Sequence, residues 1–199
     1  MTIVMAIIAW NVLLVTIARR GGRARRLSLR KADRWFAAVT FGGAAIPLVS
    51  HVDVSVGIGL VSIAVAANVD AQTGYIFDSL TVAGVFGVTV AATLEGRALD
   101  SVGGALAAAG TMSLIWAITR GRGLGVGDVK LSALVGAAFG PLGGVTAIGL
   151  SFITGACVAV VRIFAGKARF GMSVRFGPYV LAGSVCLLAY HRLSDGVFR

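Results

Sequence analysis

Charged residues are scarce in this sequence. Of its 199 residues, 13% are charged and 57% are hydrophobic, and the mean hydropathy is +0.92. A soluble domain is about 25% charged and about 45–50% apolar, and a disordered chain needs low hydrophobicity. The 28 glycines follow no Gly-X-Y period, which excludes collagen. The composition therefore predicts an all-α integral membrane protein, a polytopic helix bundle.

Cysteine and histidine are also rare. Cys157 and Cys186 lie in separate apolar stretches and form no CxxC pair, so we expect two buried, small hydrophobic side chains rather than a disulfide framework. His51 and His191 are far apart in the sequence and provide no ligand cluster, which argues against a zinc enzyme. No G-x-S-x-G motif is present, which argues against an intramembrane serine protease. We predict no metal and no cofactor.

Charged residues divide the chain into seven uncharged runs. Most of them have 16 to 19 residues, at the short end of the roughly 17–25 that a membrane-spanning helix needs. The runs are 1–18, 35–52, 54–69, 79–94, 101–119, 131–161 and 176–191.

The run 131–161 is too long for one span. Gly140 and Pro141 in its middle predict a break. We therefore expect a short helix at 129–139 and a full span at 142–161, which gives a bundle of about eight spans.

The distribution of basic residues favours this topology. With eight spans, 15 of the 18 lysines and arginines fall on one side of the membrane, eight of them in the loop 19–34. A single crossing by 131–161 would reduce this number to 13. Basic loops stay in the cytoplasm, so the net charge of +10 indicates orientation rather than nucleic-acid binding. We predict one membrane domain over 1–199, whose loop 19–34 either contacts anionic lipid or simply fixes the orientation.

Three aspartates end or begin apolar runs on the predicted cytoplasmic face: Asp70, Asp78 and Asp128. Ionisable groups at or within a membrane are costly and are therefore candidates for function. Structural roles are the alternative. Asp128 suits a helix N-cap and Asp78 a first helical turn, and Asp70 suits an interfacial loop.

Glycines alternate with other residues before Asp128, at 121, 123, 125 and 127. They match neither the phosphate-loop pattern G-x-x-x-x-G-K-[ST] nor the dinucleotide pattern G-x-G-x-x-G. They form either a flexible linker or a surface where Gly125 and Gly127 let backbone or a bound extended peptide approach a carboxylate.

Three segments, taken together, resemble the type IV prepilin peptidases, which are membrane aspartyl proteases. The sequence G-V-G-D-V-K-L at 125–131 resembles their GxGD signature. The segment 70–78 is similar to their D-x6-P-[DN] motif, and R-F-G-P-Y at 175–179 is similar to P-F-G-P-[FY]. Phe77 and Arg175 each stand where the family often has proline. The cytoplasmic domain with paired CxxC motifs, found in larger members that also N-methylate, has no counterpart here.

The resemblance implies that Asp70 and Asp128 are the catalytic aspartates. It also implies a site at the cytoplasmic face of the bacterial inner (plasma) membrane. There the enzyme would cut the basic leader from a pilin-like precursor, just before the substrate's hydrophobic helix. The proposed partners are thus that precursor and membrane lipid, with no nucleic acid. Supporting or substrate-binding roles fall to Asp78, Gly125, Gly127, Lys130, Gly177 and Pro178.

Two other functions are compatible with parts of the sequence. A small proton- or cation-coupled transporter would need its acidic residues deep within spans, whereas these aspartates lie at span ends. A non-catalytic pilus-assembly membrane protein that retains the fold is the second alternative, and Phe77 keeps it open.

Overall fold

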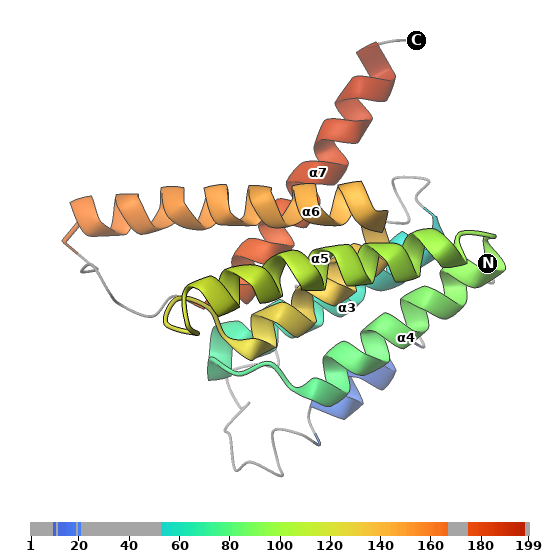
Figure 1. Cartoon of the computed structure of the whole chain (residues 1–199), viewed down its shortest axis with the longest axis horizontal. Coiled ribbons are helices and arrows are strands. Elements are labelled where there is room, and N and C mark those ends of the chain that lie inside the picture. The colour runs from blue at the N-terminus through green and yellow to red at the C-terminus, as the bar shows by residue number, and fades with distance from the viewer. Residues whose placement is uncertain (1–9, 11, 19, 21–52, 167–174, 198–199) are drawn as a thin grey trace.

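The computed structural model describes residues 10, 12–18, 20, 53–166 and 175–197. Every regular element in this part of the chain is a helix, so the predicted all-α class is confirmed (Figure 1). Four of the predicted runs correspond to α3, α4, α5 and α7, and the long run forms α6. The helices are α3 (Val54–Thr73), α4 (Asp78–Leu94), α5 (Ala98–Ile118), α6 (Val126–Phe164) and α7 (Gly177–Val197).

The beginning of the chain is described only in part. The residues described between Trp10 and Arg20 are helical. The Trp10 indole N–H donates a hydrogen bond to the Ser62 hydroxyl at 3.1 Å, which places this helical segment against α3. The predicted run 35–52 and nearly all of the loop 19–34 lie outside the described residues.

Helix α3 is the central element of the bundle. Its residues 55–70 are all buried, and α4, α6 and α7 each pack against it. A helix that is apolar on all sides is expected to be enclosed in this way. Close packing depends on small residues: a Cβ added to Gly59 would lie only 2.4 Å from the Cβ of Ala138 in α6. The position of α3 matters because its last turn carries Asp70.

Helix α6 bends sharply at Gly140, as the Gly140-Pro141 pair predicts. Gly140 has φ 75° and ψ −179°, a backbone conformation that residues other than glycine rarely adopt. After the bend, the second half of α6 turns back (Figure 1). A Cβ on Gly144 would come within 2.6 Å of Gly136 Cα, so the two halves pack against each other. The predicted break in this run is therefore confirmed.

The predicted number of eight spans is not confirmed. Among the described residues, three helices are long and apolar enough to cross a membrane, namely α3, α5 and α6. Helix α4 is apolar but has 17 residues. Helix α7 is not one of the three, and polar residues follow Tyr190 in its last part. The eight-span topology stays a prediction.

The two cysteines correct one expectation. Cys157 and Cys186 are exposed rather than buried. They share the outer surface of α6 and α7 with apolar side chains such as Phe164, which is 88% exposed. On the outside of a bundle that faces lipid, apolar side chains are as well accommodated as in the protein interior. An apolar run therefore does not indicate which of its residues point inward.

At the end of the bundle away from Asp70, polar contacts join α3 to the α4–α5 connection. The Ser55 amide and hydroxyl donate to the Glu95 carboxylate at 3.0 and 2.6 Å. Arg97 forms a salt bridge of 2.8 Å with Asp53. Glu95 thereby satisfies an N–H at the start of α3, where helices lack internal partners.

Candidate active site

Asp70 lies in the last turn of α3 and is 5% exposed. Its Oδ2 accepts a hydrogen bond of 2.9 Å from the backbone N–H of Gly177, the first residue of α7. The N-terminal N–H groups of a helix have no partner within the helix and carry partial positive charge. The start of α7 therefore provides a favourable site for this buried carboxylate.

Gly177 must be a glycine for this contact to form. A Cβ at this position would lie 2.9 Å from both Cβ and Oδ2 of Asp70, and 3.1 Å from Cα of Ala67. Pro178 is the second residue of α7, where the missing N–H costs no intrahelical hydrogen bond. The structure thus brings Gly177 directly to Asp70, and Pro178 is compatible with the helix start.

Asp128 lies in the first turn of α6 and is half-buried. Its Oδ2 accepts a hydrogen bond of 3.0 Å from the backbone N–H of Gly125. Gly125 is the N-cap of α6, and Asp128 is the third residue beyond it. Asp128 is therefore not the N-cap that we considered as its structural role, although its carboxylate does satisfy an N–H at that cap.

Gly127 allows the connection before α4 to approach the start of α6. A Cβ on Gly127 would be 3.3 Å from the Cβ of Ile76, tighter than ordinary van der Waals contact. This approach places the end of α3 beside the start of α6. The carboxyl groups of Asp70 and Asp128 are close enough to interact electrostatically.

Asp78 and Lys130 form a salt bridge next to the two aspartates. The Lys130 Nζ lies 2.7 Å from Asp78 Oδ1, and the side chains are 41% and 68% exposed. An exposed pair of this kind contributes about 0–1 kcal/mol to stability. Its main effect is to connect the first turn of α4 to the second turn of α6.

Phe77 preserves the local geometry in the absence of the proline expected at this position. Its φ of −75° and ψ of 129° are values that proline also adopts. Its carbonyl oxygen accepts hydrogen bonds from the N–H groups of Leu80 and Thr81 at 3.0 and 3.3 Å. The ring is 5% exposed and belongs to the main core cluster. The turn before Asp78 is therefore intact.

The structure shows one contact that sequence reasoning missed. Arg175 was notable in the sequence only as a departure from a motif. Its guanidinium Nη1 donates a hydrogen bond to the carbonyl of Ala71, the residue after Asp70. Arginine commonly satisfies the last carbonyls of a helix, but the sequence does not reveal which helix end a distant arginine reaches.

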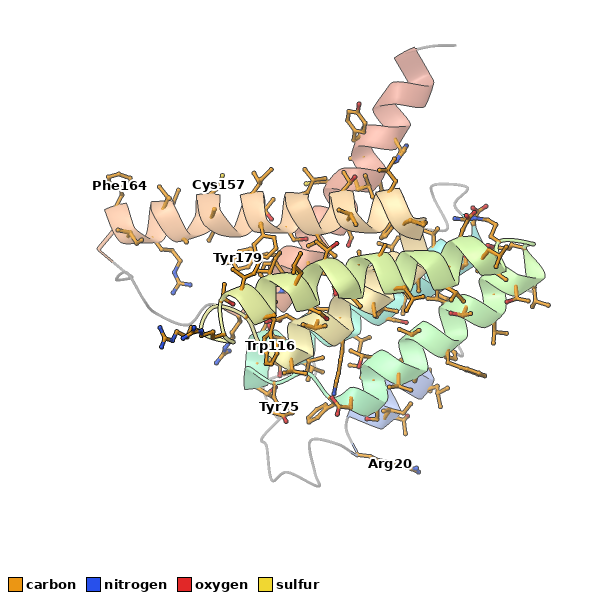
Figure 2. The ribbon with its side chains drawn as sticks, viewed as in Figure 1. Arg20, Tyr75, Trp116, Cys157, Phe164 and Tyr179 are labelled. Carbon is orange, nitrogen blue, oxygen red and sulfur yellow. The ribbon has the colours of Figure 1, made fainter. Side chains whose placement is uncertain are left out.

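The predicted site residues gather at one end of the bundle, where α3 ends and α4, α6 and α7 begin. Tyr75 projects from the connection after α3 and Trp116 from the last turns of α5 at this end (Figure 2). Within the described ranges, no group of three or more His, Cys, Asp or Glu side chains is arranged to hold a metal ion. Paired carboxylates with backbone donors can perform acid–base chemistry on a water molecule.

Comparison with known proteins gives a consistent result. The model of the type IV leader peptidase family matches residues 57–160, just over half of the chain, and this range includes the segments 70–78 and 125–131. A prepilin leader peptidase/N-methyltransferase of Burkholderia pseudomallei (strain 1026b) is 30% identical over 131 residues, covering 61% of this chain and 41% of that protein. A protein of the same name from Stutzerimonas stutzeri is 38% identical over 102 residues, 49% of this chain and 34% of that protein.

The chain thus spans less than half the length of these curated relatives. No solved structure matches it significantly. Because the family model covers more than half of the sequence, the chain belongs to the type IV leader peptidase family.

Proposed function

We propose that this protein is a membrane-embedded aspartic endopeptidase that removes the basic leader from type IV pilin-like precursors. The observation that carries the proposal is the meeting of Asp70 and Asp128 at one end of the bundle. The Asp70 carboxylate accepts a hydrogen bond from the backbone N–H of Gly177, and the Asp128 carboxylate accepts one from the backbone N–H of Gly125. The family supports a leader peptidase role, and the relatives carry that activity in their names.

The mechanism that we propose uses the two aspartates as a pair. Two adjacent carboxylates cannot both ionise easily, so they share one proton. The ionised member takes a proton from a water molecule, which attacks the scissile carbonyl. The protonated member donates to that carbonyl oxygen as negative charge develops. The carbonyl then re-forms and returns this proton, the scissile C–N bond breaks, and the leaving nitrogen takes the proton that the other aspartate removed from water. The chemistry requires no nucleophilic side chain.

The surroundings of the pair suit an extended, basic substrate. Gly125 is exposed and has no side chain beside Asp128, which leaves room for a peptide backbone, whereas the space beside Gly127 is filled by Ile76. Asp78 is largely exposed, so a basic side chain of the leader can compete with Lys130 for its carboxylate. We place cleavage at the cytoplasmic face of the bacterial plasma membrane because 15 of 18 basic residues fall on the same side as this site in the eight-span topology.

Neither alternative function has an observation in its favour. A proton or cation pathway would need acidic side chains within the spans, and Asp70 and Asp128 both lie in terminal turns of their helices. The assembly-protein alternative depended on Phe77, and Phe77 preserves the turn before Asp78.

Co-expression with a precursor tests the proposal. The precursor carries a basic leader, a glycine and a hydrophobic helix, and mass spectrometry identifies the cleaved junction. Wild type should cleave it, whereas Asp70→Asn and Asp128→Asn should not. Asp100→Asn is the matched control, because Asp100 is an exposed acid in the first turn of α5. Cleavage by either active-site variant would refute the paired-aspartate mechanism.

A further inference from the structure

Arg175 connects the segment before α7 to the end of α3. Its Nη1 donates to the Ala71 carbonyl oxygen, and its Nε lies close to Gly74, within 3.7 Å of where a Cβ would be. Two residues later, Gly177 donates its N–H to the Asp70 carboxylate. The short segment 175–177 therefore holds both the side chain of Asp70 and the backbone that follows it.

The bond to Ala71 meets a specific need of α3. The last carbonyls of a helix have no partner within the helix, and they carry partial negative charge. Gly74, the left-handed C-cap, donates its N–H to the Asp70 carbonyl at 2.7 Å. Arg175 supplies the donor for the next carbonyl, that of Ala71. The carbonyls of Asp70 and Ala71, two of the four in the last turn, are thereby satisfied.

The charge of Arg175 also acts on Asp70 directly. The guanidinium interacts electrostatically with the Asp70 carboxylate. An exposed arginine at a membrane face would commonly extend toward lipid headgroups or solvent, but this one bonds to the protein backbone beside the candidate catalytic group. Its contacts are those of a residue that orients another residue.

We propose that Arg175 is a positioning residue that fixes the last turn of α3 and so holds Asp70 against the start of α7. The inference deepens the proposed function, and it rests on that function for the claim that Asp70 is catalytic. The predicted consequence is that loss of the guanidinium loosens residues 70–77 and slows the chemical step, while substrate binding is largely unchanged.

Kinetics with Arg175→Gln, Arg175→Lys and the control Arg122→Gln test the positioning role. The Arg122 side chain is exposed and makes no hydrogen bond or ion pair within the described part of the chain. For Arg175→Gln we expect kcat to fall by about tenfold with KM within about twofold, since misorientation affects the reaction more than binding. Lysine keeps the charge and a donor, so Arg175→Lys should recover most of kcat. A raised KM with unchanged kcat would instead indicate a substrate or lipid contact and would overturn the proposal.

Hydrogen–deuterium exchange provides a readout that does not depend on peptidase activity. Backbone amides of residues 70–77 should exchange at least about threefold faster in Arg175→Gln than in wild type or Arg122→Gln. Unchanged exchange in this segment would overturn the positioning role, whatever the kinetics show. If wild type cleaves no precursor but Arg175→Gln still accelerates exchange, the proposed function fails while the structural part of the inference stands.

Discussion

At the scale of single residues, the site depends on close approaches that only glycine permits. Gly177 lets α7 begin against Asp70, and Gly127 lets the connection before α4 approach α6. In both cases glycine is required because neighbouring atoms leave no room for a Cβ, and not because of the backbone conformation, since neither residue has a positive φ. Their substitution should therefore affect the geometry of the carboxylates rather than the helices themselves.

Gly177→Ala should reduce cleavage by more than about tenfold, because the added Cβ would push α7 and Asp70 apart and disturb their alignment. Gly149→Ala is the matched control: Gly149 lies within α6, and its added Cβ would meet nothing within 4 Å. Cleavage rates of the two purified variants decide the question. Normal activity in Gly177→Ala would show that the contact with Asp70 is dispensable.

Phe77→Pro tests whether the ring or the backbone matters at this position. The backbone angles suit proline, so activity per folded molecule should be retained. The buried ring is lost, and removal of a buried phenylalanine side chain costs about 3–5 kcal/mol. We expect a clearly lower midpoint of thermal unfolding in detergent. A large loss of activity in a fully folded variant would contradict this expectation.

At the scale of elements, the bend in α6 divides the long apolar run into two segments that pack against each other. Gly140 takes a φ of 75°, and around this bend α5 packs closely against α6. A Cβ on Gly104 of α5 would lie 2.1 Å from the carbonyl oxygen of Gly136. Small residues at such interfaces allow backbones to approach in lipid. Gly104 therefore lets α5 pack directly against the backbone of α6 at and before the bend.

Gly140→Ala should destabilise the protein by about 1–3 kcal/mol, since alanine is strained in this region of φ and ψ. Gly110→Ala provides the control, because Gly110 lies within α5 and an added Cβ there meets nothing within 4 Å. Thermal unfolding of both variants measures the difference. Equal midpoints would indicate that the bend accommodates a side chain.

The sequence predicts much of this element structure because a membrane leaves few options. In lipid, backbone groups must be satisfied within the segment, so apolar runs become helices. The break at Gly140 follows from the adjacent proline, and the resemblance to the prepilin peptidase motifs implied Asp70 and Asp128 as the site candidates. Contacts such as Arg175 with Ala71 could not be predicted, since they join residues 104 positions apart. The exposure of Cys157 and Cys186 was also unpredictable, because lipid and protein interior are both apolar.

At the scale of the whole molecule, the unequal distribution of basic residues predicts the orientation of the site. The α5–α6 connection should face the cytoplasm and the α4–α5 connection the opposite side. To test this orientation, both native cysteines are replaced by alanine, and Gly123→Cys or Leu94→Cys is introduced as the one cysteine. Each variant is then treated with a membrane-impermeant thiol reagent. Leu94 is 85% exposed. In intact cells only Leu94→Cys should be labelled, and labelling of Gly123→Cys from outside would reverse the orientation.

The hydrogen bond between Asp70 and Gly177 also has a consequence for the order of synthesis. The two residues are 107 positions apart, and ribosomes add about 5–20 residues per second, so Asp70 precedes its donor by roughly 5–20 s. During this interval the carboxylate lacks its N–H partner from α7, and the pair with Asp128 is not yet fixed. A nascent chain therefore carries an unfinished site, which is completed when α7 joins the bundle.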